Sequence, residues 1–211
     1  MNLAILTFNP FQENTYVLYD GTKECIIIDP GCYENSEKLE LDNFIASSNL
    51  TPVRLINTHC HIDHVFGNAF VGKRYGLELE IHKGELPVLE ACPQVSQFYG
   101  IPYAEPSPAP GRFIEEGEVI SFGNTKLETI FTPGHSPASI SFFCREDKIL
   151  IAGDVLFRES IGRTDLPGGD HATLISSIKD KLLPLGNEVK VYPGHGPATT
   201  IGWEKERNPF L

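Results

Sequence analysis

Residues Thr58–His64 read THCHIDH, which places three imidazoles and one carboxylate within six residues, His59 to His64. His59 and His61 are two residues apart, so their side chains point the same way if this loop is extended. Asp63 and His64 follow at the expected start of a helix, where the chain turns and can present ligands to a second ion. In an apolar core these groups would lose hydrogen bonds unless a cation organised them. The stretch therefore predicts a metal site.

Three further candidate ligands each follow the carboxyl end of an expected strand. They are His135 in TPGHS, Asp154 in AGD and His195 in YPGHG. Each has a glycine beside it, which gives the turn backbone freedom, and ligands of layered α/β sheets usually bind at the carboxyl ends of strands. A single histidine after a strand is more often packed or exposed than a metal ligand. The joint pattern instead favours one cluster of seven ligands.

Apolar patterning around these motifs predicts a mixed α/β fold. Strands are expected at Leu3–Phe8, Thr15–Tyr19, Glu24–Asp29, Val53–Asn57 and, last, Val189–Tyr192, with hairpins pairing Val119–Phe122 with Lys126–Phe131 and Ser139–Cys144 with Lys148–Ala152. Helices are expected over Glu34–Ala46 and Val65–Tyr75 and after an N-cap at Asp170. The proline-rich segment Cys92–Arg112 is interpreted as an irregular excursion. This order predicts two α/β halves, packed sheet to sheet with helices outside.

Size and composition limit the class of protein further. The 211 residues, 41% hydrophobic and 21% charged, fit a single domain spanning residues 1–211. The net charge of −11 weighs against nucleic acid and anionic membranes as partners. Five cysteines without a CxxC pair indicate reduced thiols. With no long apolar run and no signal peptide at the N-terminus, the expected location is the cytoplasm.

From its first strands to GHGPATTIG, the chain resembles the metallo-β-lactamase superfamily, and within it the glyoxalase II type (hydroxyacylglutathione hydrolases) and its short bacterial relatives. The resemblance implies a four-layer αββα sandwich. It also implies a first metal site from His59, His61 and His135, a second from Asp63, His64 and His195, and Asp154 bridging the two.

Two departures from related patterns bear on the substrate. β-Lactamases proper place a cysteine near the position of Asp154, so the aspartate in GDVLF favours another activity. Full-length glyoxalase II enzymes carry a C-terminal helical extension with basic residues that hold glutathione. This chain ends at Leu211, so the identity of the thiol that carries the acyl group is left open, and glutathione thioesters are expected to bind poorly.

The predicted ligands suit two divalent ions, zinc first, with iron or manganese as alternatives. Such a pair could hold a bridging hydroxide that attacks an acyl carbonyl, and Asp63 could orient it or move a proton. A thiolate leaves without protonation and no other acid is evident. The favoured function is therefore hydrolysis of a small-molecule thioester such as S-(2-hydroxyacyl)glutathione. The oligomeric state is not set by the sequence.

Three other functions remain open on the same ligands. The first is a persulfide dioxygenase with one iron held by ligands drawn from His59, His135 and Asp154. The second is a lactone hydrolase, and the third is a metal-binding module without catalysis.

Several nearby residues carry weaker predictions. Alternation turns Cys60 away from the metal, so packing is its expected role. His82 is expected to be structural or exposed, and His171 to lie near the site at best. Arg163 and Asp165 could orient the metal loop, contact substrate or form an ordinary ion pair. Aromatic residues of the proline-rich segment could wall a substrate pocket or cover the core; these are Phe98, Tyr99 and Tyr103.

Overall fold

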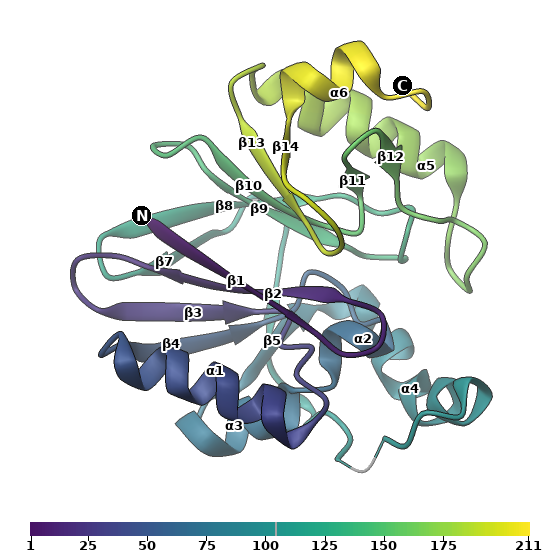
Figure 1. The fold of residues 1–211 in the computed structure, drawn as a ribbon. Helices are drawn as coiled ribbons and strands as arrows, with labels where there is room; N and C mark the ends of the chain where they lie inside the picture. Colours follow the sequence, from purple (N-terminus) through teal and green to yellow (C-terminus); the bar gives the residue numbers. More distant parts are fainter. Residues whose placement is uncertain (104) are drawn as a thin grey trace.

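The computed structural model describes residues 1–103 and 105–211, and it arranges them around two six-stranded sheets (Figure 1). The first sheet has the spatial order β1 (Asn2–Phe8), β2 (Glu13–Tyr19), β3 (Glu24–Ile28), β4 (Thr51–Ile56), β5 (Leu79–His82) and β6 (Pro110–Ile114). The second has the order β14 (Thr199–Thr200), β13 (Lys190–Pro193), β10 (Ile149–Gly153), β9 (Ile140–Cys144), β8 (Thr125–Phe131) and β7 (Val119–Phe122). A separate two-stranded ribbon pairs β11 (Leu156–Phe157) with β12 (Ser160–Ile161).

Helices cover the outer face of each sheet. The first sheet carries α1 (Asn35–Ser47), α2 (Ile62–Val65), α3 (Asn68–Tyr75), the short turn η1 (Lys83–Glu85) and α4 (Leu86–Tyr99). The second sheet carries α5 (His171–Ser176), which continues into η2 (Ser177–Leu182) and η3 (Leu183–Leu185), and α6 (Ile201–Arg207). Figure 1 shows α1 and α3 below the sheets and α5 and α6 above them.

Three apolar cores separate these layers. Successive side chains of a strand point to opposite faces, so in β2 Tyr16 and Leu18 pack between the sheets while Val17 packs toward the helices of the first layer. In the second sheet, Phe142 lies in the central core, whereas its neighbour Phe143 packs against the α5 side. The molecule is therefore a four-layer αββα sandwich, as predicted.

Local turn and cap predictions are confirmed. β7 and β8 pair with Phe122 opposite Thr125, so Gly123-Asn124 forms the two-residue hairpin turn. Asp170 caps α5, its side chain accepting a hydrogen bond from the backbone N–H of Thr173. No helix among the residues described is both long and apolar enough to cross a membrane.

The proline-rich segment is only partly irregular, so that prediction was wrong over its first part and again at its end, where β6 begins at Pro110. Helix α4 runs through Pro93 to Tyr99. An interior proline removes one helical hydrogen bond, but Leu89, Cys92 and Ser96 are buried along one face of the helix and hold it in place. Ala104, inside the same predicted segment, lies outside the described residues.

Two other expectations need correction. The helix predicted over Val65–Tyr75 is instead α3 (Asn68–Tyr75), preceded by the short α2 (Ile62–Val65), with Phe66 and Gly67 between them. A Cβ at Gly67 would lie 2.5 Å from Cys32 Sγ, so the chain there needs a residue without a side chain. In addition, the strand predicted as the last one is followed by β14, which pairs antiparallel with β13.

Candidate metal centre

The predicted ligands converge at one edge of the sandwich, where strands of both sheets end. The HCHIDH loop follows β4 of the first sheet, and the other three ligands follow strands of the second. An isolated bridge between Glu13 and His195 joins the sheets at this edge. The strand-end pattern thus brings together residues from separate parts of the chain.

The side chains form two compact groups. In the first, ligand atoms of His59, His61 and His135 all lie within 4.8 Å of one another. In the second, those of Asp63, His64 and His195 do so within the same limit. These are the two trios that the family resemblance implied. Asp29 joins His59 and His64 in a third such group.

Asp154 lies between the two trios. Its Oδ2 is 3.5 Å from His135 Nε2 and 3.5 Å from His195 Nε2, and its Oδ1 is 3.5 Å from His64 Nε2. Asp63 Oδ2 lies 3.0 Å from His195 Nε2. One carboxylate therefore faces histidines of both groups, as a bridging ligand would.

Several of the predicted ligand atoms are buried and have no hydrogen-bond partner. Among the described residues, His59 Nε2, His64 Nε2 and Asp154 Oδ1 are buried without any hydrogen-bond partner. Leaving such atoms unpaired costs about 1–3 kcal/mol each. Imidazole nitrogens and carboxylate oxygens gathered within a few ångströms are the ligand atoms that zinc, iron and manganese accept. The residues present therefore fit divalent metal ions.

The far ring nitrogens of several histidines are held by oxygen acceptors. His135 Nδ1 donates to the carbonyl of Arg163 at 2.7 Å, and His195 Nδ1 donates to the carbonyl of Phe11 at 3.1 Å. A carbonyl can only accept, so each of these rings carries a proton on Nδ1 and turns Nε2 toward the other predicted ligands. His135 Nε2 lies 2.9 Å from His61 Nδ1, and His195 Nε2 lies 3.0 Å from Asp63 Oδ2.

Asp29 organises the other side of the centre. It accepts hydrogen bonds from both the backbone N–H and the hydroxyl of Thr58, at 2.7 and 2.6 Å. With its proton committed to Asp29, the Thr58 hydroxyl is the acceptor for His59 Nδ1, 3.0 Å away. Asp29 Oδ2 also lies 3.2 Å from His64 Nδ1. A single carboxylate thus orients one histidine from each trio.

Local electrostatics put three of the predicted ligands in metal-binding forms, whereas, despite burial, neighbouring carboxylates raise the pKa values of His64 and His195. Burial and the neighbouring His64 lower the pKa of His59 well below its usual value, and burial and His135 lower the pKa of His61 to about 3. Burial alone would raise the pKa of Asp154, but His64 and His135 lower it overall. Metals bind neutral imidazoles and ionised carboxylates, so these three groups need no proton removed.

Comparison with known proteins agrees with this geometry. The family model described as the metallo-β-lactamase superfamily matches residues 8–195. The chain belongs to the metallo-β-lactamase superfamily.

Relatives within the superfamily carry several names. Hydroxyacylglutathione hydrolase GloC of Haemophilus influenzae is 38% identical over 212 residues, covering 100% of this chain and 98% of that protein. The crystal structure of BLEG-1 B3 metallo-β-lactamase is 36% identical with a TM-score of 0.90, covering 100% of this chain and 99% of that one. TTHA1623, solved in a di-iron-bound form, is 38% identical with a TM-score of 0.88, covering 99% and 100%.

A pocket of about 780 Å³ lies beside the predicted metal ligands. Five of the seven reach its wall: His61, Asp63, His135, Asp154 and His195. Because most of the predicted ligands line this pocket, a substrate could bind there next to the metal ions that they would hold.

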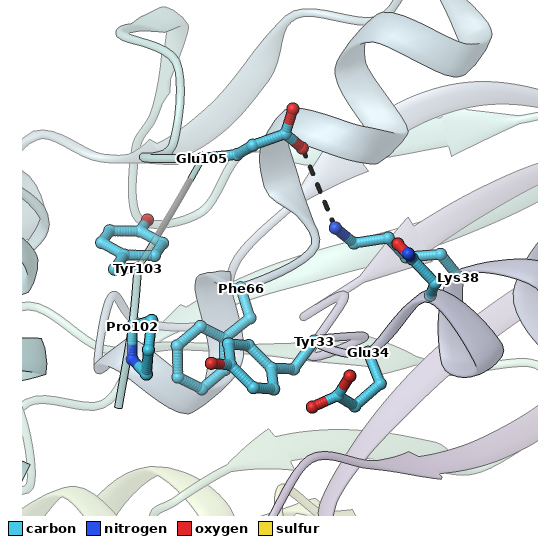
Figure 2. A pocket seen from close by; sticks show the side chains of 8 residues that line it. Tyr33, Glu34, Lys38, Phe66, Pro102, Tyr103 and Glu105 are labelled. Carbon is cyan, nitrogen blue, oxygen red and sulfur yellow. Dashed lines mark ion pairs between the residues drawn. The ribbon is translucent and has the colours of Figure 1, made fainter. Parts of the chain in front are cut away.

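A second, smaller cavity of about 230 Å³ lies away from the centre (Figure 2). It is lined by Tyr33, Phe66, Tyr103 and the Lys38–Glu105 ion pair, among others, and by none of the predicted ligands. Its rings pack on one another, with centroids 4.8 Å apart for Tyr33 and Phe66. We therefore assign no part of the metal centre to this cavity.

The three aromatic candidates of the proline-rich segment lie in different places relative to the two cavities. Tyr99 lines the large pocket, and Tyr103 lines the small cavity instead. Phe98 is 85% exposed and lines neither. Among the three, only Tyr99 is placed to contact a substrate at the centre.

The structure also shows where the residues with weaker predictions lie. Cys60 is fully buried in the core of the first layer, which confirms packing. His82 accepts a hydrogen bond from the backbone N–H of Gly84 and so has a structural role. His171 is exposed and does not line the large pocket. Arg163 pairs with Asp165 through two 2.7 Å hydrogen bonds and orients His135 through its backbone carbonyl, not its side chain.

Two of the buried carboxylates that the sequence did not predict accept hydrogen bonds from the ligand loops. Asp29 ends an expected strand in IIIDPG, so its position at a strand end was a usable signal. Glu85 has no such signal, yet its carboxylate accepts hydrogen bonds from Cys60 N, Ser136 Oγ and Ala138 N. It therefore joins the loop of His59 and His61 to the loop of His135.

Proposed function

We propose that this metallo-hydrolase cleaves a thioester, with S-(2-hydroxyacyl)glutathione as the substrate class suggested by GloC. One observation carries the proposal: Asp154 lies between two trios of potential ligand atoms and is one of five predicted ligands that line an open pocket. We further propose that residues 1–211 act as one unit, with metal ligands His59, His61, Asp63, His64, His135, Asp154 and His195.

The seven side chains would hold two divalent ions. Such ions would supply a water made acidic near neutral pH and a positive charge that stabilises the developing oxyanion. Hydrogen bonds at Nδ1 orient three of the histidines, His59, His135 and His195.

Asp63 is the proposed catalytic residue. Although burial raises its pKa, the neighbouring His64 and a hydrogen bond from His195 lower it overall, so the carboxylate is ionised. It reaches the pocket wall, where it can orient the attacking water or accept its proton. Most titratable residues that are described in the pocket are proposed metal ligands, so few remain to act as a general acid. A thiolate needs no proton to leave, and a thioester therefore suits this pocket.

Turnover at measured metal content tests this proposal. We expect S-lactoylglutathione to be cleaved with a higher kcat/KM than a matched oxygen ester, a β-lactam or a homoserine lactone. Asp154→Ala should lower kcat by more than the roughly 10–100-fold typical of residues that only orient ligands. His82→Ala, outside the cluster, is the matched control and should retain activity.

Other outcomes would replace the proposal. A clear preference for the lactone or the β-lactam would assign that hydrolysis to the same centre. Oxygen uptake with glutathione persulfide, without thioester cleavage, would indicate a dioxygenase. Equal losses from Asp154→Ala and His82→Ala would mean that the cluster is misassigned.

A further inference from the structure

One face of α4 forms a wall of the large pocket. Val88, Ala91, Val95 and Tyr99 all line it, and their spacing of three or four residues places them on one side of the helix. Three of them carry only hydrocarbon side chains. The helix thus presents an apolar strip beside the proposed metal ligands His61 and Asp63, which line the same pocket.

Apolar side chains from the second half of the chain line this pocket too. Phe157 and Ile161 belong to the β11–β12 ribbon, and Leu166 follows it. Figure 1 shows this ribbon above α4 on the same side of the molecule. Both halves therefore contribute hydrocarbon surface to one binding space.

Charged partners for a substrate are scarce in this space. Apart from histidines, the described lining residues include one basic side chain, Arg163. Its guanidinium is already paired with Asp165 through two hydrogen bonds of 2.7 Å. A carboxylate entering the apolar part would lose hydration without gaining a free cation. The moiety that fits there is uncharged.

Aromatic contacts extend the apolar wall toward solvent. Phe11 packs edge-on against Tyr99 with ring centroids 5.7 Å apart, and Tyr99 packs against Phe98 at 5.4 Å. Phe11 and Tyr99 line the pocket, whereas Phe98 is 85% exposed. Within the pocket, Phe11 and Tyr99 therefore add aromatic surface to the strip of α4, together more than a methyl group can cover.

We infer that the pocket selects substrates carrying an aryl or medium-length alkyl group next to the scissile carbonyl, with the α4 strip and Tyr99 as the residues that determine this preference. The inference rests on the proposed thioester hydrolysis for its chemistry. Its basis, the apolar wall, is separate from the metal ligands, so binding can be measured without turnover.

Two thioethers of glutathione that cannot be hydrolysed provide the binding test. S-hexylglutathione and S-methylglutathione share one carrier and differ only in the chain. For wild-type protein with its metals, calorimetry should give roughly ten-fold or tighter binding of the hexyl compound, as expected if several methylenes are buried. Equal affinities for the two compounds would overturn the inference.

Substitutions locate the preference on the wall. Tyr99→Ala and the nearly isosteric Val95→Thr should each reduce the hexyl-to-methyl affinity ratio several-fold. Phe98→Ala, the neighbouring aromatic outside the pocket, should leave the ratio unchanged. A ratio that falls equally in Phe98→Ala and Tyr99→Ala would place the chain outside the pocket and contradict the assignment.

Turnover separates this inference from the function on which it rests. S-mandeloylglutathione and S-lactoylglutathione differ by a phenyl in place of a methyl group, and kcat/KM should favour the phenyl compound in wild type but not in Tyr99→Ala. Equal turnover of the pair would reject the apolar preference while supporting thioester hydrolysis. Absence of turnover with a retained hexyl preference in binding would reject thioester hydrolysis and keep the apolar site.

Discussion

Glu85 accepts a hydrogen bond from the backbone N–H of Cys60 at 2.9 Å, and Cys60 stands between His59 and His61 of the first trio. The same carboxylate accepts from the hydroxyl of Ser136 at 2.7 Å and from the backbone N–H of Ala138 at 2.7 Å. Ser136 directly follows His135, the third member of that trio. One fully buried side chain thus holds both loops of the first group at a fixed separation.

Replacing Glu85 with glutamine should loosen the first metal site. An amide NH₂ would face a donor that the carboxylate now accepts, so we expect a loss of about 2 kcal/mol in the free energy of unfolding. Metal affinity should fall by roughly 10–100-fold. Urea denaturation and competition with a chromophoric chelator measure the two effects. Glu90→Gln, an exposed change on the following helix α4, should alter neither.

The number of bound metals tests the ligand assignment directly. Seven proposed ligands exceed the roughly four that one ion needs, so native protein should hold close to two transition-metal ions per chain. His61→Ala should lose metal and activity together, whereas His82→Ala should lose neither. Elemental analysis after gentle purification and resupply with zinc or manganese gives the count. One ion at most in wild type would reject the dinuclear centre.

The metal ligands could be predicted from sequence because local features mark them. His195 is typical: it follows a strand and stands next to a glycine in YPGHG. Glu85 has no such mark, since its partners Cys60 and Ser136 lie 25 and 51 residues away and meet it only when the layers close. Helix α4 was missed in part because Pro93 indicates a break, whereas burial of its apolar face outweighs that local cost.

Asp20 should make folding stability depend on acidity. Burial raises its pKa, but hydrogen bonds from Thr22, Asn124 and Thr125 outweigh that effect and lower the pKa from 3.8 to about 2. A pKa lowered by folding stabilises the protein above pH 3.8, and this contribution disappears as the pH falls toward 2. After allowance for solvent screening we expect it to be about 1 kcal/mol.

Comparison of Asp20→Asn with wild type isolates this contribution. The variant should be less stable near pH 6, and the difference should shrink between about pH 4 and pH 2. Urea denaturation across that range measures it, with the exposed change Glu206→Gln as the control. A constant difference at every pH would show that the Asp20 hydrogen bonds do not depend on its ionisation.

Gly194 leaves no room for a side chain beside the centre. A Cβ there would overlap Asp154 Oδ1 and lie 2.7 Å from His64 Cε1. Its backbone cannot retreat easily, because its N–H donates to Gly153 O at 2.9 Å and its carbonyl accepts from Asn14 N at 2.7 Å. An added methyl group must therefore displace Asp154 or His64, which belong to the proposed bridge and the second trio.

Gly194→Ala should accordingly lower metal content and kcat together while leaving most of the fold intact. The free energy of unfolding should fall by only about 1–3 kcal/mol, as is usual for one overpacked position. Gly21→Ala is the matched control, since a Cβ at Gly21 would meet nothing within 4 Å. Elemental analysis, turnover and urea denaturation of both variants distinguish local displacement from general destabilisation. If Gly194→Ala kept two ions and full activity, Asp154 would not be the residue that bridges the two sites.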